Sequence, residues 1–215
     1  VITLRCTQSE YRNNVLIKCA QGVSTKERGV GVFEELQPDD PQQVGPFRLT
    51  ARLGSGGMGR VYLGRSKTGR LVAVKVIRPE LADDPDFRRR FAREVAVART
   101  VSGFFTAGLV AAGPDDSPPW LATVYIPGIS LDRAIADHGP WPEHSVLALG
   151  AGLAEALEAI HATGIVHRDL KPSNVLLGAD GPRVIDFGIS VALEASRLTR
   201  TGMTVGTPAS CPPSS

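Results

Sequence analysis

The sequence has little of what would mark a membrane, secreted or nucleic-acid-binding protein. Its 215 residues contain no apolar run of the roughly 18 residues that a membrane helix needs. The N-terminus shows no basic segment followed by an apolar stretch, so we expect no signal peptide. The formal net charge is only +2, which gives no basic footprint for nucleic acid.

Cysteine is also scarce, and its positions form no disulfide framework. The three cysteines are Cys6, Cys19 and Cys211. An odd number without regular spacing predicts reduced thiols and a cytoplasmic protein. With 42% hydrophobic and 21% charged residues, the composition is that of an ordinary globular protein.

The first 46 residues sustain neither the period of a strand nor that of a helix. We expect residues 1–35 to be a poorly ordered extension. Residues 36–46 are rich in Pro, Asp and Gln, and this composition predicts a linker.

Strand patterns begin at Phe47. Phe47, Leu49 and Ala51 alternate with polar residues, as on a half-buried strand. After a glycine cluster and a turn, residues 71–77 form an apolar strand, and residues 120–126 form another. The glycines and the turn between them predict hairpins.

Helix patterns dominate later. Asp84 can cap a helix that starts at Pro85. The apolar residues of that helix share one face: Phe87, Phe91, Val95 and Ala98. Residues 131–136 and 145–162 predict two further helices. Strands come first and helices afterwards, so the predicted class is α+β with two lobes.

A glycine cluster separates the first two strand patterns. It comprises Gly54, Ser55, Gly56, Gly57, Met58 and Gly59. Glycines allow backbone amides to approach phosphate oxygens without a Cβ in the way. In dinucleotide-binding folds a helix follows such a cluster, whereas here a strand follows. This context favours a flap over nucleotide phosphates, although a flexible turn stays possible from the glycines alone.

Lys75 ends the strand motif Val72-Ala73-Val74-Lys75. Alternation places Ala73 and Lys75 on the face opposite to Val72 and Val74. An ammonium that emerges from a buried strand needs a counter-ion, and Glu94 on the following helix is the best candidate. Such a pair would hold Lys75 against the phosphates of a nucleotide.

The segment 167–174 reads His-Arg-Asp-Leu-Lys-Pro-Ser-Asn. Asp169 could accept the proton of an attacking hydroxyl, and Lys171 could neutralise a transferring phosphoryl group. Asn174 offers an amide oxygen to Mg²⁺. Twelve residues later, Asp186 begins an Asp-Phe-Gly motif directly after an apolar strand, which suits a second Mg²⁺ ligand.

Together, these motifs resemble the signature set of the eukaryotic-type serine/threonine protein kinases of bacteria. The resemblance covers roughly residues 45–208. It implies that ATP and Mg²⁺ are used, that Thr123 is the gatekeeper, and that Val124, Tyr125 and Ile126 form the hinge. The residues that it places near adenine or ribose are Leu53, Val61, Ala73 and Ser130. It also implies that Thr207 contacts the catalytic aspartate and lysine.

The resemblance gives a domain plan. It assigns residues 47–126 to the small lobe and hinge, and residues 127–208 to a partial large lobe with the catalytic and activation loops. After Pro208 the family pattern is lost, so residues 209–215 are expected to be an aberrant tail, which we interpret as the product of a frameshift.

We expect Thr199 and Thr201 to be autophosphorylated. Without the remaining helices, apolar surface on the helix 145–162 is expected to promote self-association.

The leading interpretation is therefore a serine/threonine protein kinase that transfers the γ-phosphoryl group of ATP to protein hydroxyls, its own included. The alternative is a truncated, non-catalytic kinase fragment that binds nucleotide or a protein partner. A dinucleotide-dependent enzyme is a third interpretation, disfavoured because no βαβ unit follows the glycines.

Overall fold

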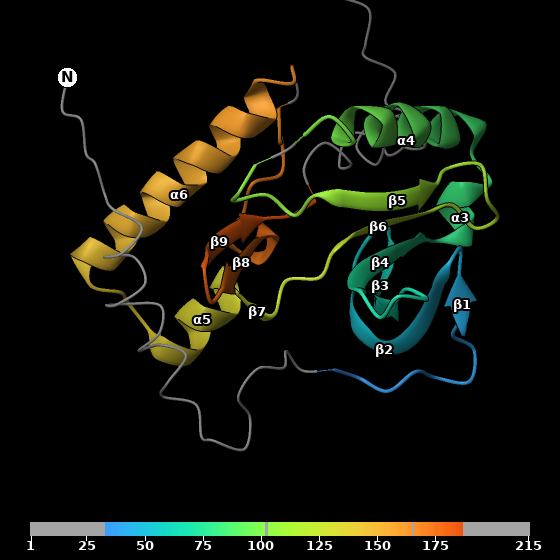
Figure 1. The fold of residues 1–215 in the computed structure, drawn as a ribbon, viewed down its shortest axis with the longest axis horizontal. Coiled ribbons are helices and arrows are strands. Elements are labelled where there is room, and N and C mark those ends of the chain that lie inside the picture. Colours follow the sequence, from blue (N-terminus) through green and yellow to red (C-terminus); the bar gives the residue numbers. More distant parts are fainter. Residues whose placement is uncertain (1–32, 102, 165, 187–215) are drawn as a thin grey trace, which may run out of the picture.

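The computed structural model of the chain describes residues 33–101, 103–164 and 166–186. These residues form two lobes, joined by the connection that follows Val124 (Figure 1). Strands dominate the smaller lobe and helices the larger one. The arrangement confirms the predicted α+β class with two lobes.

The smaller lobe is built on an antiparallel six-stranded sheet in the order β1-β2-β3-β4-β6-β5. Its strands are β1 (Gln43–Val44), β2 (Phe47–Ser55), β3 (Gly59–Arg65), β4 (Leu71–Ile77), β5 (Leu109–Gly113) and β6 (Trp120–Val124). The predicted alternation is confirmed in β2, where Phe47, Leu49 and Ala51 are buried. Of the strands, β1 and β5 were not predicted from the sequence.

One face of this sheet is covered by a helix, as Figure 1 shows. A short helix, α3 (Pro79–Ala82), leads into α4 (Pro85–Ala98). Asp84 caps α4 as predicted, because its carboxylate accepts from the Asp86 amide at 2.8 Å. The predicted face is the buried one, and its members Phe87, Phe91 and Val95 pack on Ile77 and Leu121 of the sheet.

The larger lobe contains helices and a small sheet. Its elements are β7 (Gly128–Ser130), α5 (Leu131–His138), α6 (Glu143–His161), the 3-10 helix η1 (Pro172–Asn174), β8 (Val175–Gly178) and β9 (Gly181–Val184). The sheet order is β7-β8-β9, with antiparallel pairing throughout.

The buried face of α6 agrees only in part with the apolar stripe that the sequence predicts for the helix 145–162, which runs through Leu149, Leu153, Leu157 and Ile160. Ile160 is fully buried, whereas the three leucines are only half-buried. The fully buried residues are Ser145, Gly152, Ala156 and Ile160. Small residues lie there because β9 approaches closely: a Cβ on Gly152 would come within 2.7 Å of Pro182 Cγ.

The expected linker at residues 36–46 is instead packed on the small lobe. Val44 lies in the core with Phe47 and Trp120, and Leu36 packs against the same cluster. The Asp40 carboxylate is fully buried. The linker prediction from composition was therefore wrong, because Asp39 and Asp40 form ion pairs with Arg52 and Arg60 of the small lobe. Of the extension predicted at residues 1–35, residues 1–32 lie outside the described residues, as does the tail at 209–215. Residues 33–35 are described, and Glu34 forms a backbone bridge with Arg52.

Within the ranges that the structure describes, none of the helices combines the length and the apolar character required to cross a membrane.

Candidate active site

The segment 166–174 is held in an unusual backbone conformation by a buried histidine. His167 is almost fully buried. The Asp169 amide donates to His167 Nδ1 at 3.3 Å, so Nε2 carries the hydrogen that is donated to the Ile185 carbonyl at 3.1 Å. Arg168 between them has a φ of 62°, a left-handed value that non-glycine residues rarely adopt. Such conformations cluster at functional sites, where surrounding contacts enforce them.

Asp169, Lys171 and Asn174 converge within this segment. Lys171 Nζ donates to Asp169 Oδ2 at 2.8 Å, and Asn174 Nδ2 donates to the same oxygen at 3.2 Å. Asn174 Nδ2 also donates to the Asp169 carbonyl at 2.8 Å, which fixes the amide orientation. The hydrogen bond from Lys171 holds the pKa of Asp169 below its usual value, with Asn174 adding to the effect. The Asp169 carboxylate is therefore ionised at neutral pH.

Lys75 reaches this region from the small lobe. In β4 Val72, Val74 and Val76 alternate as buried residues with the half-buried Ala73 and Lys75, which lie on the opposite face, as predicted. Lys75 Nζ contacts Asp186 Oδ2 at 2.8 Å, although the two residues are 111 positions apart. Asp186 has a φ of 58°, a second left-handed non-glycine residue. Lys75 and Asp186, the basic and the acidic residue predicted for the phosphate site, are thus brought together.

The predicted ion pair between Lys75 and Glu94 is not among the ion pairs of the described residues. The ammonium instead contacts Asp186. Glu94 lies in α4 one position before the buried Val95, at a half-buried site. The sequence pattern therefore selected the wrong partner for this conformation, since the helical period fixes the face of Glu94 and not its distance from β4.

Asn174 and Asp186 are adjacent in the fold and supply oxygens suited to Mg²⁺. The Ile185 amide donates to the Asn174 carbonyl at 3.0 Å, and Val175 pairs with Val184 between the two strands. Because the Nδ2 group of Asn174 is already bound to Asp169, its amide oxygen is the atom that can coordinate a metal. No cluster of three His, Cys, Asp or Glu side chains within the described ranges could hold a metal alone. Two protein oxygens fit a cation that arrives with phosphate ligands.

The glycines where β2 leads into β3 have different surroundings. A Cβ on Gly59 would lie 1.9 Å from the Val76 carbonyl oxygen, so β4 excludes any side chain there. A Cβ on Gly54 or Gly56 would have no neighbour within 4 Å. Packing among the described residues therefore explains Gly59 but not Gly54 or Gly56. Open space above exposed glycines is what a phosphate-binding loop provides.

The position predicted for Met58, in the same loop, was wrong. It was expected to contact the nucleotide, but its side chain is buried in the core with Ile77, Phe87 and Phe91. The side chain therefore anchors the loop to α4 instead of facing a ligand. Ser55 and Gly57 are exposed, and Ser55 pairs with Arg60 at the base of the loop.

Of the apolar residues expected near adenine, Val61 and Ala73 lie on the face of the sheet that carries Lys75. Val61 is directly opposite Lys75 in the β3–β4 pairing, and Leu63 is opposite Ala73. Side chains of directly opposed residues point to the same face of a sheet. Leu53, Val61 and Ala73 are all half-buried, as expected for the wall of an open site.

The predicted hinge is the connection between the lobes. Thr123 and Val124 end β6, where Thr123 pairs with Ala73. The Val124 amide donates to the Gly108 carbonyl at 3.0 Å and the Tyr125 amide to the Leu71 carbonyl at 3.5 Å. Ser130 precedes α5 at its N-terminal cap position and lies at the end of β7.

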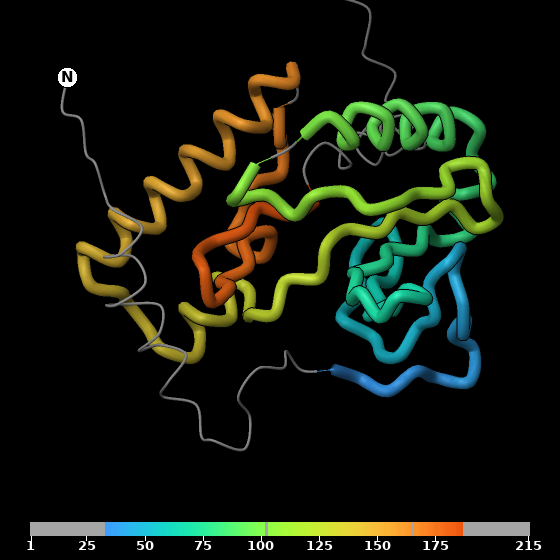
Figure 2. Tube along the Cα trace, in the orientation of Figure 1, coloured from blue at the N-terminus to red at the C-terminus, as the bar shows by residue number. Residues whose placement is uncertain are grey.

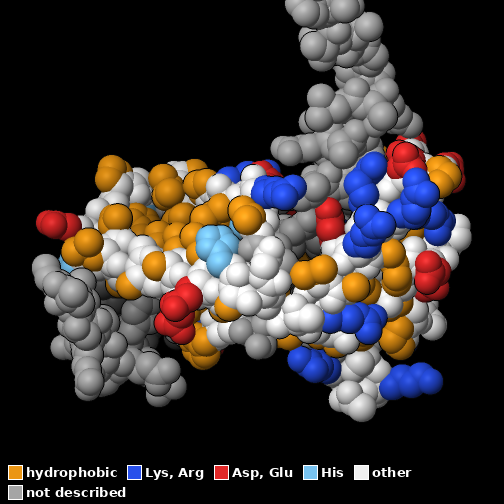
Figure 3. Space-filling model, turned by 90° about the horizontal axis from the view of Figure 1, so that it is seen from above, with side chains coloured by type: hydrophobic (Ala, Val, Ile, Leu, Met, Phe, Trp, Pro, Cys, Tyr) orange, Lys and Arg blue, Asp and Glu red, His pale blue; other side chains and the backbone are white. Residues whose placement is uncertain are grey.

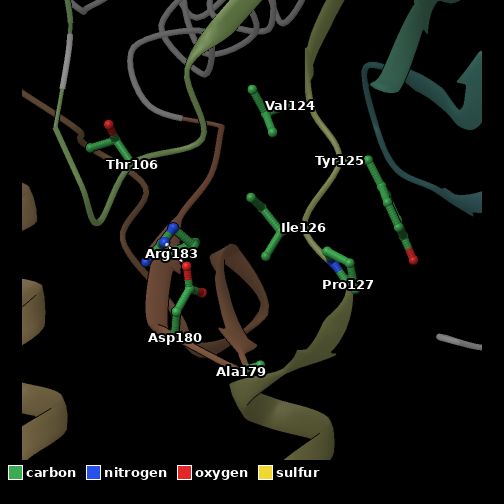
Figure 4. Close-up of a pocket in the computed structure, with 8 residues that line it drawn as sticks. All are labelled: Thr106, Val124, Tyr125, Ile126, Pro127, Ala179, Asp180 and Arg183. Atoms are coloured by element: carbon green, nitrogen blue, oxygen red, sulfur yellow. Dashed lines mark hydrogen bonds and ion pairs between the residues drawn. The ribbon is translucent and has the colours of Figure 1, made fainter. Parts of the chain in front are cut away.

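A cavity of about 460 Å³ adjoins the hinge (Figure 4). It is lined by Thr106, Val124, Tyr125, Ile126, Pro127, Ala179, Asp180 and Arg183. None of the glycine loop, Lys75, Asp169 or Asp186 belongs to its lining. The cavity is therefore separate from the charged cluster. Figure 4 shows Ile126 on the side of Arg183 and the Tyr125 ring extending to the other side of the hinge.

Some functional features were missed by sequence reasoning or lie outside the described residues. The hydrogen bond of His167 to Ile185, which joins the segment 167–174 to the residues before Asp186, was not predicted. The presence of His167 in the motif was the sequence signal that could have indicated this contact. Thr207, Thr199 and Thr201 lie outside the described residues.

Comparison with known proteins agrees with this geometry. The family described as "Protein kinase domain" matches residues 47–214. The chain is 56% identical over 176 residues to the probable serine/threonine-protein kinase PkwA of Thermomonospora curvata, covering 82% of this chain and 24% of that protein. It is also 56% identical over 178 residues to the serine/threonine-protein kinase AfsK of Streptomyces griseus, covering 83% and 22%. The chain thus spans about a quarter of the length of these relatives.

A solved structure shares the fold. The crystal structure of the Mycobacterium tuberculosis PknI kinase domain superposes with a TM-score of 0.62 at 34% sequence identity. The match covers 70% of this chain and 63% of that one. By its motifs, its fold and these relatives, the chain belongs to the serine/threonine protein kinase family of bacteria.

Proposed function

We propose that this chain is a serine/threonine protein kinase that transfers the γ-phosphoryl group of ATP to protein hydroxyls, including its own. The observation that carries the proposal is the 2.8 Å contact between Lys75 and Asp186 across the two lobes. This contact joins the strand face beside the glycine loop to Asp186. The preceding residue, Ile185, is hydrogen-bonded to His167 and Asn174 of the segment that also holds Asp169 and Lys171. A phosphoryl-transfer site needs these groups in one place, because its catalysis consists mainly of positioning and charge stabilisation.

In this proposal, Asp169 is the general base. Its lowered pKa keeps the carboxylate ionised, so it can accept the proton of a serine or threonine hydroxyl. Lys171 donates to the same carboxylate and would balance negative charge on the transferring group. Thr207 would contact both residues.

Lys75 would bind the phosphates of the nucleotide beneath the glycine loop. Its ammonium is largely buried, with 12% of the side chain exposed, and such a group binds anions strongly. We expect Glu94 to take over as its carboxylate partner when Asp186 turns to a metal. Asn174 and Asp186 would hold Mg²⁺, which when bound neutralises charge on the phosphate oxygens.

The hinge would bind adenine through its backbone. Among the described residues, the Ile126 amide has no hydrogen-bond acceptor, so it is free to donate to a ring nitrogen. Leu53, Val61 and Ala73 would supply the apolar walls. Thr123 would limit the depth of the pocket, and Ser130 would contact ribose.

The proposal is tested by incubating the full chain with Mg²⁺ and radiolabelled ATP. We expect phosphate incorporation that disappears in Asp169→Asn, since an amide cannot accept the proton. ATP binding, measured separately by calorimetry, should survive in that variant and weaken strongly in Lys75→Met. Incorporation that is equal in wild type and Asp169→Asn would contradict the assigned base.

A second candidate function is favoured by one feature of α6. Its outer face exposes Val146 at 51% and Leu147 at 66%. Figure 3 shows hydrophobic side chains gathered on the left of that view of the molecule. An exposed patch of this kind marks an interaction surface or an incompletely covered core. A fragment that binds nucleotide or a protein partner without turnover would have such a face. ATP binding without any phosphate incorporation would support this second function.

A further inference from the structure

The segment 33–46 lies before the residues that the kinase family matches, yet it is fixed to the small lobe. Its anchor is Asp40, whose side chain is fully buried. Both carboxylate oxygens accept from Arg52, at 2.5 and 2.8 Å. Tyr62 donates its hydroxyl at 2.7 Å, and the Gln37 amide donates at 2.8 Å. Arg60 adds a contact at 3.2 Å, so five donor groups hold one carboxylate.

A second set of contacts extends the anchor toward the hinge. The Glu34 amide donates to the Arg52 carbonyl at 3.1 Å, and the Arg52 amide donates to the Glu34 carbonyl at 2.8 Å. This two-bond bridge is antiparallel and lines the segment up beside β2. Figure 2 shows the blue segment running along that side of the small lobe, with its end beneath the connection to the large lobe. The backbone of residues 34–40 is therefore fixed at both ends.

Phe33 is placed at the end of this fixed stretch. Its ring centroid lies 6.3 Å from that of Tyr125, with the planes tilted by 46°. This is a favourable distance for an aromatic pair. Burial raises the pKa of Tyr125, which places its ring in a partly desolvated site. Tyr125 belongs to the hinge, between the Val124 amide that donates to Gly108 and the free Ile126 amide.

We propose that residues 33–40 form a strap, latched by Asp40, and that Phe33 is a positioning residue that holds the hinge in shape for nucleotide through Tyr125. The strap rests on the proposed function, because its role is to set the affinity of that same site. Phe33 does not touch the reacting groups; it acts on the orientation of the Tyr125 peptide. Removing its ring should loosen the hinge and weaken ATP binding by roughly two- to tenfold, the range of one aromatic contact.

Two measurements on the full chain test the strap. The first is hydrogen exchange at the Val124 and Tyr125 amides without nucleotide, and the second is the ATP dissociation constant by calorimetry. Phe33→Ala should raise hinge exchange and weaken ATP binding. Phe33→Tyr, which keeps the ring, should restore both. Glu35→Ala is the matched control, since Glu35 is exposed on the same strap, and it should change neither.

The outcomes separate the strap from the proposed function. If wild type binds no ATP, the proposed function fails, and hinge exchange alone decides whether Phe33 supports the hinge. If Phe33→Ala leaves hinge exchange within twofold of wild type, the strap proposal is overturned. It is also overturned if exchange rises but ATP affinity stays the same, because the contact would then be structural only. A Phe33→Ala effect that is additive with that of Tyr125→Ala on ATP affinity would equally contradict it.

Discussion

Substitution by alanine should have different effects at two glycines of the same loop. It should lower stability at Gly59 and ATP affinity at Gly56. In Gly59→Ala the new Cβ would lie 1.9 Å from the Val76 carbonyl oxygen and 2.9 Å from the Val76 carbonyl carbon. Both are backbone atoms of a central strand, so relief requires β3 and β4 to separate. In Gly56→Ala the new Cβ would meet no atom within 4 Å.

The magnitudes follow from these distances. Forcing a methyl group into a packed site costs about 1–3 kcal/mol. For a chain of this size, each kcal/mol lowers the melting temperature by about 2–4 °C, so Gly59→Ala should melt about 2–12 °C lower. Gly56→Ala should change stability by no more than about 0.5 kcal/mol. It should still weaken ATP binding about tenfold for every 1.4 kcal/mol of clash with the phosphates.

Thermal melting without nucleotide and calorimetric titration with Mg²⁺ and ATP measure the two effects on the same preparations. The expected pattern is a lower melting temperature in Gly59→Ala, and weaker ATP binding at an unchanged melting temperature in Gly56→Ala. Equal melting temperatures for wild type and Gly59→Ala would refute the packing argument. Unchanged ATP affinity in Gly56→Ala would refute the assignment of the open space to phosphate.

Three further predictions concern charge and packing. The hydrogen bond from Lys171 lowers the pKa of Asp169. Lys171→Met should therefore raise the pKa of Asp169 and move the acid limb of the kcat/KM profile to higher pH. If the limb does not move, Asp169 is not the titrating base. The Arg52 guanidinium holds the pKa of Asp40 well below its usual range, so the stability from Asp40 is complete above the unfolded pKa of about 3.9 and declines as the pH falls further. Asp40→Asn should therefore reduce the loss of unfolding free energy at acid pH, measured by urea unfolding. An unchanged dependence on pH would contradict the anchoring role of Asp40. Phe91 is fully buried, so Phe91→Ala should lower the free energy of unfolding by about 3–5 kcal/mol in urea, and a loss below about 1 kcal/mol would show that the α4 core can repack.

The local features of the fold were predictable from sequence because they repeat at short range. The alternation in β4 and the buried face of α4 follow from periods of two and 3.6 residues, and both were found as expected. The cap at Asp84 depends only on the next two residues. Asp169, Lys171 and Asn174 also lie close together in the sequence, so their convergence follows from one turn of the chain.

Long-range contacts could not be predicted in this way. Asp40 resembled a linker residue because its partners Arg52, Arg60 and Tyr62 lie 12 to 22 positions away. The partner of Lys75 depends on where the two lobes meet, which no local period encodes. Met58 was assigned to the nucleotide site because all residues of the glycine loop were assigned together. Its side chain instead packs against α4, and this contact is not visible in the sequence of the loop.

We propose that Asp169, Lys75 and Asp186 act together when the chain phosphorylates hydroxyl groups of proteins. Mass-spectrometric mapping of the purified chain after incubation with Mg²⁺ and ATP tests it most directly, with Asp169→Asn as the matched control. We predict phosphoserine or phosphothreonine in wild type, with Thr199 and Thr201 as expected positions, and none in the variant. No phosphorylated serine or threonine in a wild-type preparation that binds ATP would contradict the claim and leave a nucleotide-binding protein.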